Sequence, residues 1–159
     1  NLNMFDKKLF AHMEEIDLCW KSKITGYKNL VEPKSIVYHK GSITLEQGSY
    51  KKVYLNHRNS LILFLTNHNL IITLMLFIPR VSLDILSMIR YLLIGKIKNV
   101  FAQIHAILWL IVHPIYLILR IVNINKIKIL PLYSIMKSML IGSIALDYFI
   151  KRKKIFSDF

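Results

Sequence analysis

The sequence predicts an α/β segment over residues 1–59, followed by a mainly α-helical, membrane-associated region over residues 60–159. Two observations carry this prediction. Residues 10–39 read as helix, turn and strand, because an acidic and partly apolar run precedes Gly26 and a β-branched and aromatic run follows it. From Ser60 onward the chain becomes rich in Ile and Leu, and Lys or Arg occurs in every connector, as in helices that lie at a membrane surface.

The first helix is expected to begin after Asp6, a residue type that caps helix N-termini, and to end near Gly26. The strand is expected over residues 35–38, with His39 at its end. Residues 41–48 are polar and bounded by glycine, which is typical of a loop.

Three carboxylates lie within four positions of the expected helix. Glu14 and Asp17 share a face, whereas Glu15 points about 100° away from Glu14 on a helix of 3.6 residues per turn. Asp17 and Lys21 are four residues apart and can form an ion pair across one turn. Trp20 and its neighbours favour burial, so the cluster combines charge with apolar side chains.

The apolar half contains two stretches about long enough to cross a bilayer. Residues 60–79 carry polar side chains at their centre, at positions 66–69, where such groups are costly. Residues 100–122 are the better candidate, although Gln103, His105, His113, Pro114 and Arg120 interrupt them. In a protein with several membrane spans, Lys and Arg are concentrated in the connectors on the cytoplasmic side. Here every connector carries Lys or Arg, so that one-sided bias is missing. We therefore expect interfacial helices, with residues 100–122 as the single exception.

The charge of the chain indicates which class of partner it binds, and its cysteine content limits the disulfides it can form. The chain has 22 Lys and Arg against 9 Asp and Glu, a formal net charge of +13. Most of this excess falls in the apolar half, a combination that favours an anionic membrane surface and argues against nucleic acid. Cys19, the single cysteine, excludes an internal disulfide and fits a buried apolar position.

Residues 5–21 read FDKKLFAHMEEIDLCWK, residues 26–28 read GYK and residues 33–39 read PKSIVYH. This order resembles the end of the catalytic domain of bacterial family 2 glycosyltransferases of GT-A fold, in particular the rhamnosyltransferase-like members that build cell-surface polysaccharides. The resemblance is strong over residues 4–59 and weaker beyond. Residues 1–59 would then be a C-terminal fragment of that domain, with the nucleotide-binding half upstream of Asn1.

The resemblance implies an inverting transferase that moves a sugar from a nucleotide-sugar donor to a glycan or lipid-linked acceptor at the cytoplasmic face of the bacterial inner membrane. Glu15 would be the catalytic base, within an acidic cluster completed by Glu14 and Asp17. Trp20 would contact the acceptor, and His39 would help to hold Mg²⁺ or Mn²⁺. The family often has Asp at the position of Glu15, and the Asp-x-Asp motif that completes its metal site does not occur in this chain.

Each of these residues also has a structural interpretation. Acidic residues are common at a solvated helix start, Trp20 can serve packing alone, and His39 can simply end a strand. The alternative hypothesis for the whole chain is a small, non-enzymatic helical membrane anchor or assembly protein.

Overall fold

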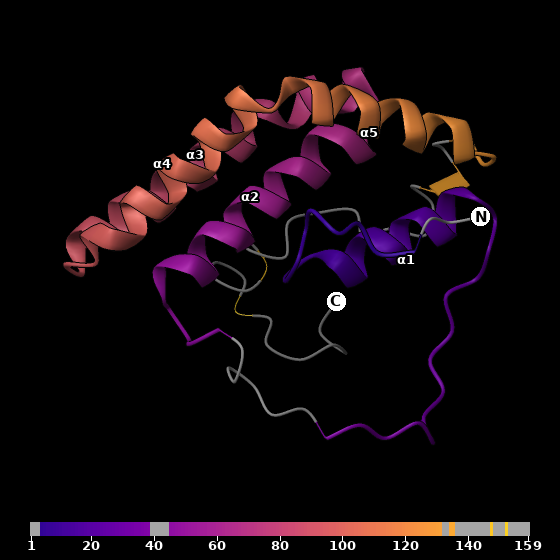
Figure 1. Cartoon of the computed structure of the whole chain (residues 1–159), viewed down its shortest axis with the longest axis horizontal. Helices are drawn as coiled ribbons and strands as arrows, with labels where there is room; N and C mark the ends of the chain where they lie inside the picture. The colour runs from indigo at the N-terminus through magenta and orange to yellow at the C-terminus, as the bar shows by residue number, and fades with distance from the viewer. Residues whose placement is uncertain (1–3, 39–44, 132–133, 136–146, 148–151, 153–159) are drawn as a thin grey trace.

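The computed structural model describes residues 4–38, 45–131, 134, 135, 147 and 152. These residues form five α-helices joined by short turns and one longer connection (Figure 1). The helices are α1 (Glu14–Ile24), α2 (Tyr50–Asn67), α3 (Leu70–Leu93), α4 (Ile97–Val112) and α5 (Pro114–Ile127).

The expected α/β segment is wrong for the part of the chain that the structure describes, which contains helices and no strand. Residues 35–38 have no regular structure, and the side chains of Val37 and Tyr38 are 81% and 95% exposed. A strand needs a neighbouring strand for its backbone hydrogen bonds, and none is present among the described residues. The expected helical character of the C-terminal region is confirmed for α3, α4 and α5.

The first helix begins later than predicted but ends where predicted. Asp6 accepts a hydrogen bond from the backbone N–H of Lys8 at 2.9 Å, so it closes a local turn rather than capping the helix. α1 begins at Glu14, after Met13 in the left-handed region with φ of 68°. Gly26 takes a φ of +88°, which is accessible to glycine at low cost and turns the chain away after Ile24.

The polar residues at 66–69 lie where one helix ends and the next begins. α2 ends at Asn67 and α3 begins at Leu70. The side chain of Asn69 accepts a hydrogen bond from the N–H of Ile72 at 2.9 Å and thereby caps α3. Residues 60–79 therefore do not form one helix.

Residues 100–122 are also divided, because α4 and α5 meet at His113 with a bend of 74°. Pro114 occupies the first position of α5, where its missing N–H removes no helical hydrogen bond. α3, with 24 residues, is the helix among the described residues that is long and apolar enough to cross a bilayer by itself.

The core lies between α2 and the α4–α5 pair, with α3 against α4 and α1 beside α5 (Figure 1). α2 contributes Ile62 and Leu63, which pack against Leu9 and Leu110. Ala102 and Ala106 of α4 are fully buried, and their small side chains suit the extensive packing of α4 against α2. A second cluster joins Ile24 of α1 to Ile124 of α5 and Ile135.

Candidate functional site

The outer face of α1 carries an open cavity of about 410 Å³. Glu15 and Cys19 lie one turn apart on this face, as do Ile16 and Trp20. The cavity is lined by Glu15, Ile16, Cys19, Trp20, Lys23, Asn29 and Ile135. The predicted base and the predicted acceptor-binding aromatic residue therefore line the same hollow.

The three carboxylates of α1 occupy different environments. Asp17 is fully buried and forms ion pairs with Arg120 and, at 2.7 Å, with Lys21. Glu14 is half-buried, and its Oε2 atom is shielded from solvent without a hydrogen-bond partner among the described residues. Glu15 is exposed. The predicted Asp17–Lys21 pair is confirmed, and Glu15 is the member of the cluster that can meet a ligand.

Arg120 of α5 organises the inward side of α1. Its guanidinium donates to Asp6 Oδ2 at 2.6 Å and to Thr66 Oγ1 at 2.9 Å, in addition to its bond with Asp17. Tyr116 donates to the same Asp6 oxygen at 2.8 Å. Through these bonds Arg120 links α1 to α2 and α5. The links are strong constraints, because a buried guanidinium that lost its partners would be costly. The sequence signal was a lone Arg in an apolar run, which predicts a buried partner without naming it.

The groups around Asp6 lower the pKa of its carboxyl group. Burial by itself would raise its pKa, but the hydrogen bonds from the Lys8 N–H and Tyr116 and the charge of Arg120 outweigh burial. The pKa of Asp6 therefore lies below its ordinary value of 3.8, and the carboxylate is charged at neutral pH.

The loop before α1 is held by two consecutive polar residues of α2. Asn59 Nδ2 lies 2.8 Å from each of the carbonyl oxygens of Leu9, Ala11 and His12. Arg58 donates to the carbonyl of Lys8 at 2.6 Å and also to the Asn59 side chain. This clamp stabilises a loop with several residues in the left-handed region, namely Phe10, His12 and Met13. No local sequence pattern singles out Arg58 and Asn59 as partners of a loop 50 residues away, so their clamping role was missed.

Trp20 packs against a neighbouring ring and also borders the cavity, while its contact with an acceptor stays a prediction. Its ring packs edge-on against His68, with ring centroids 5.2 Å apart, and it also lines the cavity with Glu15. Burial lowers the pKa of His68 below its ordinary value of 6.5, so this imidazole is neutral at pH 7. The indole Nε1 is shielded from solvent and has no hydrogen-bond partner among the described residues.

The expected metal site cannot be assembled from what the structure describes. His39 lies outside the described residues, and among those residues no three His, Cys, Asp or Glu side chains gather as metal ligands. The described part of the chain therefore does not fit Mg²⁺ or Mn²⁺ by itself, and we assign no chemical step to a metal.

Comparison of the chain with protein-family models, with curated proteins and with solved structures finds no match.

Proposed function

We propose that the chain is the C-terminal, membrane-associated part of an inverting glycosyltransferase. It would transfer a sugar from a nucleotide-sugar donor to a glycan or lipid-linked acceptor in cell-surface polysaccharide synthesis. The observation that supports this proposal most strongly is the exposure of Glu15 in a cavity shared with Trp20, within a run of residues that resembles this family.

The chemistry assigned to Glu15 is general-base catalysis. A sugar hydroxyl is a weak nucleophile, and a carboxylate within hydrogen-bond reach can accept its proton as the oxygen attacks the anomeric carbon. The new glycosidic bond forms on the face opposite the bond to the nucleotide diphosphate, which departs with the electron pair. Trp20 offers an apolar surface for a sugar ring beside the base.

Asp17 is given a supporting role. The ion pairs of Asp17 with Arg120 and Lys21 hold α1 in place, so that Glu15 projects outward. This makes Asp17 a positioning residue rather than a participant in proton transfer.

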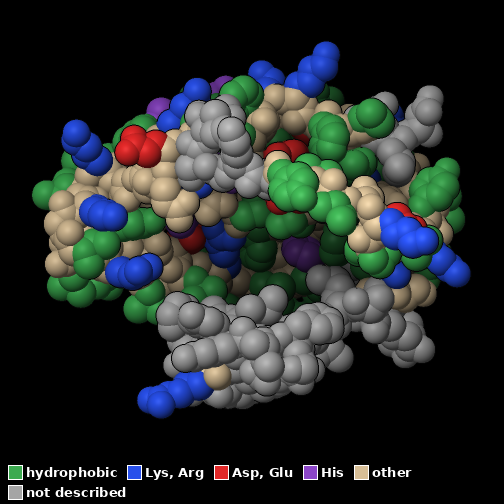
Figure 2. Space-filling model, turned by 90° about the horizontal axis from the view of Figure 1, so that it is seen from below, with side chains coloured by type: hydrophobic (Ala, Val, Ile, Leu, Met, Phe, Trp, Pro, Cys, Tyr) green, Lys and Arg blue, Asp and Glu red, His purple; other side chains and the backbone are tan. Residues whose placement is uncertain are grey.

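Association with a membrane is supported by the surface of the helices. Large apolar side chains are exposed along α3, including Leu74, Met75 and Ile78 at 62%, 72% and 75%. On the face shown in Figure 2, hydrophobic side chains reach the surface beside Lys and Arg side chains. A soluble protein seldom exposes so large an apolar surface, whereas apolar groups flanked by cations suit the headgroup boundary of an anionic bilayer. We place this surface on the cytoplasmic face of a bacterial inner membrane.

The test is sugar transfer by the full-length protein and by its Glu15→Gln variant, with labelled nucleotide sugars and lipid-linked or glycan acceptors. Loss of the base should lower kcat by about 10² to 10⁴-fold while donor affinity stays unchanged. Glu32→Gln is the matched control, because Glu32 is exposed and does not line the cavity, and it should retain turnover within a few-fold. Equal turnover of Glu15→Gln and the parent protein would refute the assignment.

The second candidate is a non-enzymatic helical membrane anchor or assembly protein. The observation that favours it is the all-helical character of the described residues together with the exposed apolar side chains of α3. This alternative predicts membrane binding without any nucleotide-sugar affinity in the full-length protein. Calorimetric titration with nucleotide sugars separates the two hypotheses.

A further inference from the structure

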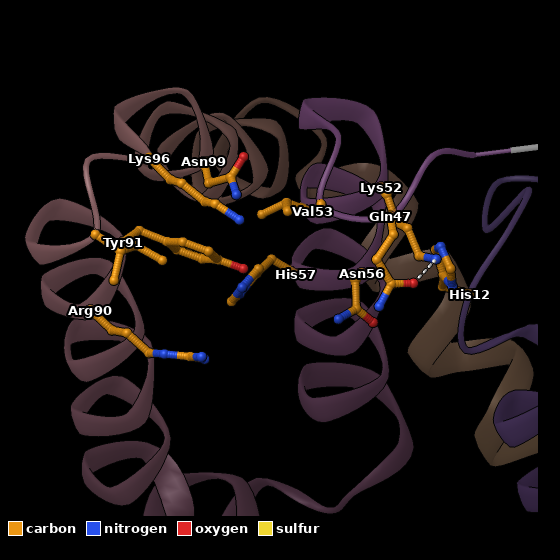
Figure 3. A pocket seen from close by; sticks show the side chains of 12 residues that line it. His12, Gln47, Lys52, Val53, Asn56, His57, Arg90, Tyr91, Lys96 and Asn99 are labelled. Carbon is orange, nitrogen blue, oxygen red and sulfur yellow. Dashed lines mark hydrogen bonds between the residues drawn. The ribbon is translucent and has the colours of Figure 1, made fainter. Parts of the chain in front are cut away.

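A second cavity, of about 400 Å³, lies where α2, the end of α3 and the start of α4 meet (Figure 3). Three cationic side chains line it from three different elements: Lys52 from α2, Arg90 from α3 and Lys96 from the turn before α4. Among the described residues that line this cavity, none is acidic. The cavity is separate from the hollow that contains Glu15.

The three cations are not neutralised by carboxylates within the described part of the chain. Lys52 Nζ donates to Gln47 Oε1 at a long 3.4 Å, and ion pairs to Arg90 or Lys96 are not found among those residues. Lys96 Nζ lies on the Gly48 side of the cavity, 4.0 Å from the point that a Cβ on Gly48 would occupy. Positive charges that converge on one hollow repel each other, and a bound anion relieves that repulsion.

Asp84, whose carboxylate approaches the cavity lining, is already paired with other side chains. Asp84 approaches His57, which also lines the cavity, with 3.6 Å between Oδ1 and Nδ1. The same carboxylate forms a 2.9 Å ion pair with Arg80. His57 further contacts Gln103 at 2.9 Å. Asp84 is therefore engaged with partners on the helices and does not cancel the charge of the cavity.

The helix ends around the cavity add to its positive potential. α2 and α4 both begin here, and the start of a helix carries partial positive charge. α3 ends here, but its last carbonyls accept hydrogen bonds from the N–H groups of Ile94, Gly95 and Lys96. His12 also lines the cavity, and its Nε2 atom is shielded from solvent without a hydrogen-bond partner among the described residues.

Apolar side chains adjoin the cavity at the turn between α3 and α4. Ile94 lines the cavity and is half exposed, while Leu93 and Ile97 beside it are 82% and 54% exposed. Cations next to exposed aliphatic side chains match a ligand with an anionic head and a hydrocarbon tail.

We infer that this cavity binds the phosphate of an anionic membrane lipid, with the hydrocarbon chains lying along the α3–α4 turn. The inference does not depend on the role of Glu15. It holds equally for a transferase and for a membrane anchor.

The test uses the full chain in a neutral detergent and counts bound ligand by native mass spectrometry. The probes are short-chain phosphatidylglycerol, short-chain phosphatidylcholine and inorganic phosphate. The triple variant Lys52→Gln, Arg90→Gln, Lys96→Gln removes the cations of the cavity. The matched control Lys28→Gln, Lys98→Gln, Lys126→Gln removes the same charge from exposed positions that do not line it.

Phosphatidylglycerol should bind the parent chain and the control variant with similar affinity, and the cavity variant at least about tenfold more weakly. Phosphatidylcholine should bind weakly to all three. An equal loss in both triple variants would show that only total charge matters and would overturn the inference. Inorganic phosphate binding as tightly as the lipid would assign the cavity to a free anion instead.

A folding control keeps the comparison valid. All three chains should share the same far-UV circular dichroism spectrum and melting temperature within a few degrees. If the triple cavity variant unfolds, the single variant Arg90→Gln carries the test, because Arg90 is exposed on α3 and makes no ion pair within the described residues. Unchanged phosphatidylglycerol affinity in a folded Arg90→Gln chain would then overturn the inference.

Discussion

Arg120 shows how one residue can connect distant parts of this chain. It is 5% exposed, and its guanidinium bonds reach Asp6, Asp17 and Thr66, which belong to three different segments. A charge buried this deeply is stable only because its partners supply matching oxygen atoms. Its removal would leave the buried Asp17 with Lys21 as its sole ionic partner among the described residues.

Replacement of Arg120 by Met should therefore lower the free energy of unfolding by about 3–5 kcal/mol, the range for breaking a buried ion pair. Chemical denaturation of the full chain in detergent measures the effect. Arg120→Lys should recover only part of the loss, because an ammonium cannot reproduce the forked geometry. A loss below about 1 kcal/mol, the value of an exposed ion pair, would contradict the structural role of Arg120.

His68 gives the protein a pH dependence whose sign can be stated. Burial lowers its pKa below 6.5 in the folded protein, so the unfolded chain takes up a proton first as the pH falls. Stability that is fully present above pH 6.5 should decline as the pH is lowered through 6.5 toward the folded pKa, where the decline ends. The free energy of unfolding, measured between pH 7.5 and about pH 5, reports this slope.

His68→Gln should flatten that slope, since the glutamine side chain does not titrate. The matched control is His105→Gln, because His105 is exposed and stacks on Tyr54 at the other end of α2. An identical slope in the parent chain and in His68→Gln would show that another group causes the pH dependence.

At the scale of helices, features set by the local sequence could be predicted, whereas features set by long-range contacts could not. Gly26 marks the end of α1 by its own backbone preference, and this boundary was predicted. Pro114 also begins a helix for a local reason, but the prediction treated it only as an interruption within residues 100–122. Asp6 was expected to cap α1 because its residue type favours that position. Its carboxylate instead contacts Arg120, 114 residues away, and no local pattern announces such a partner.

The strand predicted at residues 35–38 failed for a related reason. Ile36, Val37 and Tyr38 have strong strand preference, but a preference becomes a strand only where another strand pairs with it. In the candidate site, the faces of the helix on which the carboxylates lie could be predicted. The 3.6-residue period alone separates Glu15 from the face of Glu14 and Asp17, and the structure has the same separation.

The burial of small side chains on α4, the helix that packs against α2, leads to a further prediction. Ala106 is fully buried on α4, so the larger side chain of Ala106→Leu must displace its neighbours. We expect a loss of about 1–3 kcal/mol in the free energy of unfolding, typical of overpacking. Leu108→Ala, at a position 53% exposed, is the matched control on the same helix and should change stability by less than half as much. Tolerance of leucine at position 106 would mean that the two helices are not closely packed.

At the scale of the whole molecule, the question is how the apolar surface meets a bilayer. α3 could cross a bilayer by length, but it carries the Arg80–Asp84 ion pair near its middle. Cations also follow its C-terminal end, at Lys96 and Lys98. Burying the ion pair at the centre of the hydrocarbon would be costly, whereas a helix lying in the interface keeps these groups at the headgroups. The interfacial arrangement is therefore the expected one.

This arrangement predicts that both ends of α3 face the same side of the membrane. In a Cys19→Ser background, the variants Leu70→Cys and Leu93→Cys can each be labelled with a membrane-impermeant maleimide in sealed vesicles, since the two positions are 73% and 82% exposed. We expect both cysteines to react from the same side, and at equal rates after detergent is added. Labelling of the two positions from opposite sides would establish α3 as a span, and the Arg80–Asp84 pair would then lie within the membrane, shielded by Ser60 of α2, which accepts a hydrogen bond from Arg80 at 2.7 Å.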